Sequence, residues 1–312
     1  MDNLKHYSVM LSECIEGLNL KSGGIYFDGT LGGGGHSYEI LKNSAPDGKL
    51  VATDLDSYAI SRADERLKKF SGRYTLVKDN FKNFSSIKEE LNIDEFDGII
   101  LDLGVSSFQL DDRSRGFSYM ATDEKLDMRM NRDASLTAEK VVNEYAEEEL
   151  KEIFREYGEE KFASVIAKNI VLARKNKRIE TVSELNAIID KSIPIKFKQN
   201  GHPSKKVFQA LRIEVNEELS SLYETVLDMA RSLKKGGRIV IITFHSLEDR
   251  IVKRAFKELE CDCICDKSLP VCVCGKRKEI EIITRHPLVA SEEELKNNSR
   301  SKSAKLRIAQ KI

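Results

Sequence analysis

A doubly wound, mostly parallel α/β sheet with a helical insertion is the fold class that this sequence of 312 residues predicts. Three observations lead to it. Short apolar runs alternate with amphipathic stretches over the first hundred residues, a glycine-rich loop follows the first run, and residues 137–193 show helical periodicity without a convincing strand. Strands that alternate with helices form parallel βαβ units with right-handed crossovers.

Apolar runs are expected to supply the strands of this sheet. Four buried parallel strands are expected in the N-terminal part, at residues 25–28, 50–54, 74–77 and 98–102. Helical spacing at residues 59–67 supplies a crossover between the second and third strand. Lys235-Gly236-Gly237 leads into residues 238–244, which are expected to be a fifth buried strand, and residues 280–284 and 305–309 are expected to be a final strand pair.

The chain between residues 108 and 204 is expected to be a mainly helical, inserted substrate-recognition domain. Charged segments with helical periodicity cover residues 138–157, 160–175 and 182–193. Thr181 and Glu184 have the spacing of a capping box at the start of the last segment. Residues 1–107 and 205–312 would then form the main domain together.

Composition and charge indicate a cytoplasmic globular protein. Lys and Arg number 51, as do Asp and Glu, so no overall positive field indicates a nucleic-acid partner. Basic residues gather only locally, at residues 168–178 and from Lys296 onward, where they could contact phosphates or form a solvated face. No apolar run reaches the roughly 18 residues of a spanning helix, and no secretory signal begins the chain.

A glycine-rich loop, GTLGGGGHS at residues 29–37, follows the first expected strand. Glycines let a backbone turn tightly and approach a ligand where a Cβ would clash. In doubly wound sheets this loop lies where cofactors bind, and Asp54 ends the second strand, where a carboxylate can bind ribose hydroxyls. A plain turn and a helix-capping aspartate are the alternatives.

Two further residues bear on the kind of cofactor. Ser37 stands where a dinucleotide fingerprint G-x-G-x-x-G would have its third glycine, which argues against a dinucleotide. Phe81 follows the third strand, where its ring could cover an adenine or pack in the core.

Seven motifs carry a resemblance that spans nearly the whole chain. They are residues 6–13 (HYSVMLSE), 28–37 (DGTLGGGGHS), 102–112 (DLGVSSFQLDD), 115–120 (RGFSYM), 126–130 (LDMRM), 208–213 (FQALRI) and 244–250 (FHSLEDR). In these motifs the chain resembles the RsmH or MraW family of bacterial 16S ribosomal RNA cytosine-N4 methyltransferases.

The resemblance implies a class I S-adenosylmethionine-dependent methyltransferase, with a Rossmann-like sheet of seven strands and an inserted helical domain. It implies S-adenosyl-L-methionine as cofactor and N4-methylation of a cytidine in the decoding region of 16S ribosomal RNA. The partner would be this RNA within the small ribosomal subunit, with no DNA and no membrane, and a homodimer is left open. By motif position, the cofactor should contact Gly34, Gly35, His36, Asp54, Phe81, Asp102 and Gln109.

Asp102 and His245 are the candidates for catalysis. The amine of cytosine is a poor nucleophile because its lone pair is delocalised into the ring, so its nitrogen must be held in line with its hydrogens engaged. Asp102, at the end of the fourth strand, can accept such an N–H bond, or it could cap the next turn. His245 could orient the substrate or relay the released proton, or be a buried histidine, while Ser246 and Asp249 have the spacing of a helix cap.

The insertion offers side chains for RNA. An enzyme that modifies a base must unstack it, and the rings of Phe108, Phe117 and Tyr119 could stack on the flipped cytosine or pack the insertion onto the sheet. Guanidinium groups bind phosphate bidentately. The same stretch contains four of them, on Arg113, Arg115, Arg129 and Arg132.

A cysteine cluster follows the fifth strand. Cys263, Cys265, Cys272 and Cys274 form a C-x-C…C-x-C pattern, with Cys261 just before it. In a cytoplasmic chain, clustered thiols indicate a metal before a disulfide, but C-x-C is less typical of structural zinc than C-x-x-C. Zinc and reduced thiols both stay open, and no metal is assigned.

Two other functions remain to be distinguished from the RNA cytosine-N4 methyltransferase. One keeps the cofactor but changes the acceptor to DNA or another RNA base. The other is a nucleotide- or RNA-binding assembly factor without turnover. The presence of both the glycine loop and Asp102 argues against the assembly factor.

Overall fold

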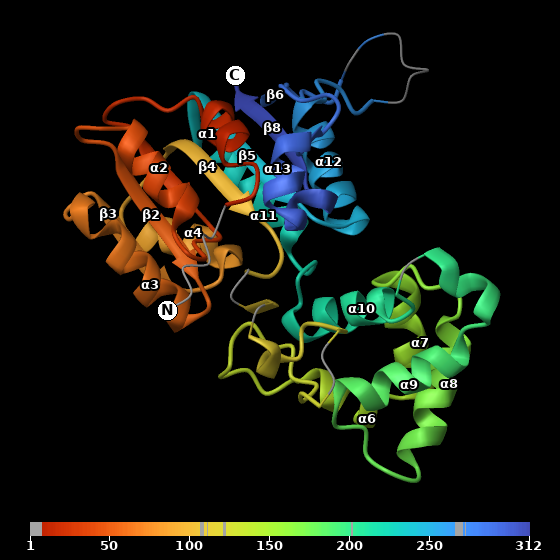
Figure 1. Cartoon of the computed structure of the whole chain (residues 1–312). Coiled ribbons are helices and arrows are strands. Elements are labelled where there is room, and N and C mark those ends of the chain that lie inside the picture. The colour runs from red at the N-terminus through yellow and green to blue at the C-terminus, as the bar shows by residue number, and fades with distance from the viewer. Residues whose placement is uncertain are drawn as a thin grey trace. The chain divides into compact units, whose positions relative to one another are not determined.

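The computed structural model of the chain describes residues 8–106, 109–110, 112–120, 123–200, 202–265, 271 and 273–312, without the side chains of residues 199 and 200. The chain divides into two compact units (Figure 1). The first unit combines Met1–Gly104 with Leu219–Ile312, and the second is Val105–Glu218.

The first unit is built on one mixed sheet, which confirms the predicted fold class. Its strands are β1 (Ile25–Asp28), β2 (Lys49–Asp54), β3 (Tyr74–Lys78), β4 (Phe96–Asp102), β5 (Leu233–Thr243), β6 (Ile280–Ile282), β7 (Leu288–Val289) and β8 (Lys305–Lys311). Seven follow the order β3-β2-β1-β4-β5-β8-β6, and β7 pairs with β8 off this path. Strands β1 to β5 are parallel, whereas β8 runs antiparallel to its neighbours. The predicted seven strands thus become eight, because two residues at β7 also pair.

Helices cover both faces of this sheet (Figure 1). They are α1 (Leu11–Leu18), α2 (Gly35–Asn43), α3 (Ser57–Leu67), α4 (Phe84–Glu90), α11 (Leu222–Arg231), α12 (Ser246–Glu260) and α13 (Glu292–Asn297), with short 3-10 turns η1 (Lys68–Phe70), η2 (Phe81–Asn83) and η5 (Ser299–Ser303). Successive residues of a strand point to opposite faces. Ile99 and Leu101 therefore pack with α4, α11 and α12, while Ile100 packs with α1, α2 and α3.

The expected strands form where the apolar runs predict them, with one difference in β5. This strand begins at Leu233, five residues before the expected start at Arg238, and so includes the Lys-Gly-Gly sequence. Phe96 pairs with Leu233 and Gly98 with Arg238, so the residues between them bulge out of the ladder. Gly236 supplies the positive φ, +80°, that this bulge requires.

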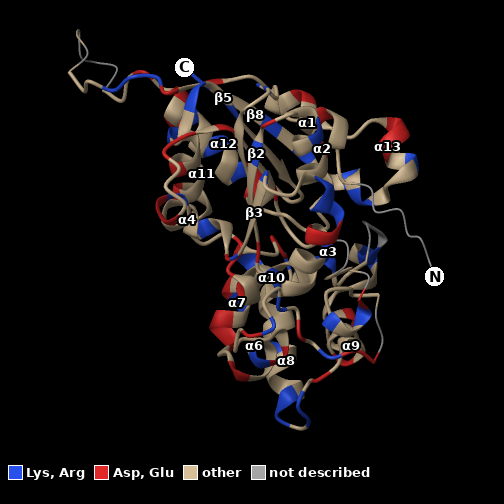
Figure 2. Ribbon diagram, turned by 90° about the vertical axis from the view of Figure 1, so that its left-hand side faces the viewer, with Lys and Arg blue, Asp and Glu red and all other residues tan. Residues whose placement is uncertain are grey.

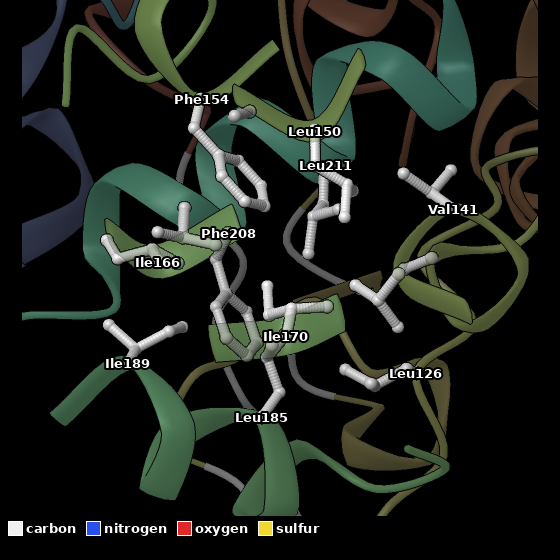
Figure 3. Packing of buried hydrophobic residues seen from close by; sticks show 14 of the residues in the cluster. Leu126, Val141, Leu150, Phe154, Ile166, Ile170, Leu185, Ile189, Phe208 and Leu211 are labelled. Atoms are coloured by element: carbon white, nitrogen blue, oxygen red, sulfur yellow. The ribbon is translucent and has the colours of Figure 1, made fainter. Parts of the chain in front are cut away.

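The second unit is helical, with its own apolar core (Figure 3). It contains α6 (Ala138–Glu144), α7 (Glu147–Glu156), α8 (Ala163–Arg174), α9 (Val182–Ser192) and α10 (Lys205–Asn216), with 3-10 turns η3 (Arg113–Arg115) and η4 (Ile195–Asn200). Thr181 caps α9 in the predicted capping box, since its hydroxyl accepts the Glu184 N–H and the Glu184 carboxylate accepts the Thr181 N–H.

The single helical segment expected at residues 138–157 is two helices. Tyr145 and Ala146 between them are extended, with ψ of 147° and 160°. Arg174 donates to the carbonyls of Val142 and Tyr145 at 2.8 and 2.6 Å, and the Glu149 carboxylate accepts the Ala146 N–H at 2.6 Å. These side chains satisfy the backbone groups that a continuous helix would have paired.

The second unit also extends beyond the predicted limit of the insertion at residue 204. Helix α10 belongs to it, because Phe208 and Leu211 lie in its core beside Ile170 (Figure 3). Gln209 also donates to the Tyr157 carbonyl at 2.8 Å. Across the residues that the structure describes, no helix is long and apolar enough to span a membrane.

Candidate active site

The glycine-rich loop connects β1 to α2, and its backbone turns tightly and packs closely against neighbouring side chains. Gly32 and Gly34 have φ of +49° and +71°, which residues with a Cβ rarely adopt. A Cβ on Gly34 would lie 3.1 Å from the Cβ of Ala63, and one on Gly35 would lie 1.9 Å from the Oγ of Ser8. A side chain at Gly34 would therefore be disfavoured by the positive φ and by Ala63, and one at Gly35 would require the Ser8 hydroxyl to move.

Two carboxylates hold this loop from the ends of neighbouring strands. Asp54 accepts the Gly32 N–H at 2.9 Å and the Asp56 N–H at 2.8 Å, and burial raises its pKa to about 6. Asp28, at the end of β1, accepts the Ser37 hydroxyl at 2.6 Å and the Thr30 N–H at 3.1 Å. Burial raises the pKa of Asp28 to about 6 as well.

Asp28 is a site residue to which the sequence analysis gave no role. Its position directly before the glycines was the only available signal, and that position does not reveal burial. We refer to Asp28, Asp54 and Asp102 together as the edge carboxylates, because each ends one of three adjacent parallel strands.

Asp102 ends β4, where its backbone N–H donates to the Oγ1 of Thr30 at 2.6 Å. Its side chain is 24% exposed, and Oδ2 lies 3.9 Å from the Nδ1 of His36. Oδ1 is buried, and no described residue donates a hydrogen bond to it. Burial raises the pKa of Asp102 to about 6, against an opposing effect of His36. Since buried polar atoms are normally hydrogen-bonded, Oδ1 is suited to the N–H of a ligand.

His36 is buried in the first turn of α2. Its Nε2 lies 3.1 Å from the carbonyl of Val9, and a carbonyl only accepts, so Nε2 carries the proton of this bond. The other ring nitrogen faces Asp102. His36 thus connects the segment before α1 to the edge of the sheet.

The remaining predicted cofactor residues lie in different units. Phe81 begins η2, three residues after β3, and its Cβ is 2.9 Å from where a Cβ on Gly29 would stand. Gln109 is buried in the second unit, where its Oε1 accepts the Ser106 N–H at 3.0 Å. The other six predicted positions all follow the carboxyl ends of β1 to β4, which meet at one edge of the sheet.

His245 lies after β5 and caps α12. Its Nδ1 accepts the Glu248 N–H at 3.4 Å, its Nε2 is 3.1 Å from the Glu248 Oε1, and the ring is 6% exposed. The other oxygen of Glu248 accepts the N–H groups of Phe244 and His245. The cap predicted at Ser246 is therefore wrong by one residue, and Asp249 instead bonds Arg307 at 2.6 Å.

The aromatic side chains proposed for stacking have different environments. Phe117 is buried in the core of the second unit, which favours the packing alternative. Tyr119 is half-buried and stacks on the ring of His202, with centroids 4.7 Å apart. Phe108 lies outside the described residues.

The four arginines divide into two pairs. Arg115 is buried and donates to the carbonyls of Arg129 and Met130, and Arg129 forms two hydrogen bonds to the Asp127 carboxylate at 2.9 and 2.8 Å. These two guanidinium groups hold the loop together and are not presented to phosphate. Arg113 and Arg132 are exposed, although Arg132 pairs with Asp112 at 3.3 Å. Elsewhere on this unit, the loop after α8 is conspicuously basic (Figure 2).

The edge carboxylates gather negative charge at one edge of the sheet. Burial is the main cause of the raised pKa of Asp54 and Asp102, and Asp28 adds to it because like charges repel in a poorly solvated environment. A positively charged ligand would relieve this repulsion. Asp54 can also accept bonds from ribose hydroxyls, since a carboxylate has about four lone-pair sites and two are used. The site therefore suits a cationic nucleoside.

The family model and the relatives similar in sequence agree on one family. Residues 3–312 match the family described as the MraW methylase family. Ribosomal RNA small subunit methyltransferase H of Clostridium botulinum (strain Loch Maree / Type A3) is 57% identical over 308 residues, 99% of either chain. The protein of that name from Lachnospira eligens is 53% identical over 309 residues, 99% of this chain and 98% of that one. A solved rRNA methylase from Streptococcus thermophilus aligns with 98% of this chain and 99% of that chain, with a TM-score of 0.40 and 11% identity.

Proposed function

The chain belongs to the MraW methylase family, and from this premise we propose that it transfers a methyl group from S-adenosyl-L-methionine to N4 of a cytidine in the decoding region of 16S ribosomal RNA. Relatives more than half identical to it carry the name ribosomal RNA small subunit methyltransferase H. That name supports small-subunit RNA as the acceptor. We place the reaction in the cytoplasm, on RNA within the small subunit.

The residues present fit this cofactor. S-adenosylmethionine supplies an electrophilic methyl group on a positively charged sulfur. The edge carboxylates carry charge of the opposite sign. The glycine-rich loop turns beside them with positive φ at Gly32 and Gly34. We propose that Asp54 binds the ribose and that Phe81 and Gln109 contact the adenosine moiety, with His36 supporting Asp102.

The observation that carries the proposal is the buried Oδ1 of Asp102, to which no residue in the described part of the chain donates. An amine N–H of cytosine would satisfy this atom. The hydrogen bond favours a pyramidal nitrogen whose lone pair is available for attack, which is the change that the delocalised amine needs.

Asp102 is also suited to the proton balance of the reaction. Transfer forms an N–CH3 bond, breaks the bond between methyl and sulfur, and leaves one surplus proton on the nitrogen. With a pKa of about 6, the carboxylate is largely ionised at neutral pH and can accept this proton. Its side chain is 24% exposed, so the proton can pass on to solvent.

We propose that His245 orients the substrate beside Asp102. Its position supports this role, because Ile242 of β5 pairs in register with Asp102 of β4, and His245 follows three residues later. The contacts with Glu248 fix the ring at the start of α12.

We propose that the second unit, Val105–Glu218, recognises the RNA. The exposed Arg113 and Arg132 and the basic loop after α8 are the candidates for phosphate contact. Phosphate would compete with Asp112 for Arg132, and with glutamates for Lys177 and Arg178 of the loop. The stacked rings of Tyr119 and His202 offer an aromatic surface for a base.

Transfer of a labelled methyl group tests the proposal. Small ribosomal subunits that lack the modification, and RNA extracted from them, would be incubated with the protein and methyl-labelled S-adenosylmethionine. We expect label in the RNA, and incorporation that is at least about 100-fold slower with the Asp102→Asn variant. Label in DNA or in another base would keep the cofactor but change the acceptor. Cofactor binding without transfer to any RNA would instead indicate an assembly factor.

A further inference from the structure

The segment between α12 and β6 contains five of the six cysteines of the chain. Its two ends are held together at the sheet (Figure 1). The Glu279 N–H donates to the Leu259 carbonyl at 2.8 Å, and the Ile282 N–H donates to the Glu260 carboxylate at 3.1 Å. The two ends of the segment therefore lie close together on the first unit.

The described part of this segment, residues 261–265, 271 and 273–278, has no apolar core of its own. None of its described residues is buried. Its larger apolar side chains Ile264, Val271 and Val273 are 70%, 70% and 76% exposed. Chain segments too small to bury an apolar core are commonly held by a disulfide or a metal ion instead.

Three of its thiols come together. The sulfur atoms of Cys263, Cys265 and Cys274 all lie within 4.8 Å of one another, and the Cys263 and Cys274 sulfurs are 3.9 Å apart. Two thiolates bound to a tetrahedral zinc ion, each at about 2.3 Å, would be roughly 3.8 Å apart. A disulfide between these two would require about 2.0 Å. The separation therefore matches shared coordination.

Backbone donors face two of these sulfurs. The Ile264 N–H donates to the Cys274 sulfur at 3.4 Å, and the Val273 N–H donates to the Cys265 sulfur at 3.3 Å. Each C-x-C segment thus directs the N–H of its middle residue at a sulfur of the other. A hydrogen bond to a sulfur favours the thiolate over the thiol. Hydrogen bonds from residues around a metal site also fix the orientation of the atoms that bind the metal.

We propose that Cys263, Cys265 and Cys274 bind a zinc ion that holds this segment together. Thiolates select soft metals, and zinc binds them in a tetrahedron without any redox step. The only covalent change is the release of the three thiol protons to solvent as the metal binds. Cys272 completes the second C-x-C in the sequence but lies outside the described residues.

Metal content tests this proposal independently of methyl transfer. The full chain would be purified with reductant and without chelator from zinc-supplemented medium, and its metals measured by mass spectrometry. We expect about one zinc per chain. Cobalt substitution should give the intense absorption of a tetrahedral thiolate site.

Cys263→Ser and Cys274→Ser should each lower the zinc content at least tenfold. Cys261→Ser is the matched control, because its sulfur bonds the Cys263 carbonyl at 2.8 Å and is not one of the three clustered atoms. It should keep the metal. If the serine variants do not fold, the thiols of the wild-type protein can be titrated with a mercurial reagent. The amount of zinc released should then rise in proportion to the number of thiols that have reacted. Less than about a tenth of a zinc per chain after reconstitution, or full retention in either ligand variant, would overturn the proposal.

Discussion

Replacing Asp102 by Asn tests its proposed role with little change in shape. The substitution removes the negative charge and one of the two acceptor oxygens. The bond from its backbone N–H to Thr30 is unaffected. We expect a folded protein that binds the cofactor and transfers methyl groups slowly.

The structure allows the effect on stability to be worked out. Burial raises the pKa of Asp102 from its ordinary 3.8 to about 6, so the ionised group costs up to about 3 kcal/mol of folding free energy at neutral pH. Because the folded pKa is raised, this cost is absent below about pH 4 and is complete once the pH exceeds 6. The variant should therefore unfold at the same or a higher temperature at neutral pH, and the difference should vanish near pH 4.

The effect on activity has the opposite sign. A hydrogen bond to a charged group is worth about 1.5–3 kcal/mol, and a positioned base contributes roughly a factor of 10² to 10⁴. We expect kcat, measured from initial rates at saturating cofactor, to fall at least about 100-fold. Asp64→Asn is the control, because Asp64 is exposed on α3 and only accepts the Tyr74 hydroxyl. A folded Asp102→Asn variant that loses less than about threefold in kcat would refute the reasoning.

Three further predictions concern the loop, the charge and the core of the first unit. Gly34→Ala should raise the Kd for S-adenosylmethionine at least tenfold by calorimetry, whereas Gly236→Ala, also at positive φ but in open space, should leave it unchanged. Protonation of the edge carboxylates below about pH 6 should weaken binding of S-adenosylmethionine more than of S-adenosylhomocysteine, whose sulfur is uncharged, and equal pH profiles would argue against recognition of the sulfonium charge. Asp249→Asn leaves the buried Arg307 without its carboxylate and should cost about 3–5 kcal/mol in denaturant unfolding. Burial raises the pKa of Asp249, but bonds from Arg307 lower it overall, so the wild-type advantage should be lost as the pH falls below about 4.

The strands were predictable because each is a short apolar run between turn residues. Strand β1 begins and ends where expected, at Ile25 and Asp28. The break between α6 and α7 was not predictable, because it depends on Arg174, which bonds the Tyr145 carbonyl from 29 residues away. The two residues of β7 carry no periodicity that could have indicated a strand.

The site was predictable to the extent that strand ends determine it. Parallel strands bring their carboxyl ends to one edge, so motif order alone placed Asp54 and Asp102 on the same side of the sheet. Burial and partners could not be foreseen. The sequence alone does not distinguish an arginine that binds phosphate from one that, like Arg115, donates to the carbonyl of Arg129. The burial of the Asp102 Oδ1 atom likewise depends on the three-dimensional structure.

The identity of the methylated nucleoside tests the central claim most directly. RNA from small subunits methylated with labelled S-adenosylmethionine would be digested to nucleosides, and the product compared with synthetic N4-methylcytidine and C5-methylcytidine by chromatography and fragmentation in a mass spectrometer. The two standards have the same mass, so retention and fragmentation must separate them. We expect all of the label in N4-methylcytidine. Label in C5-methylcytidine, or in a nucleoside other than cytidine, would contradict the role proposed for Asp102 at the exocyclic amine.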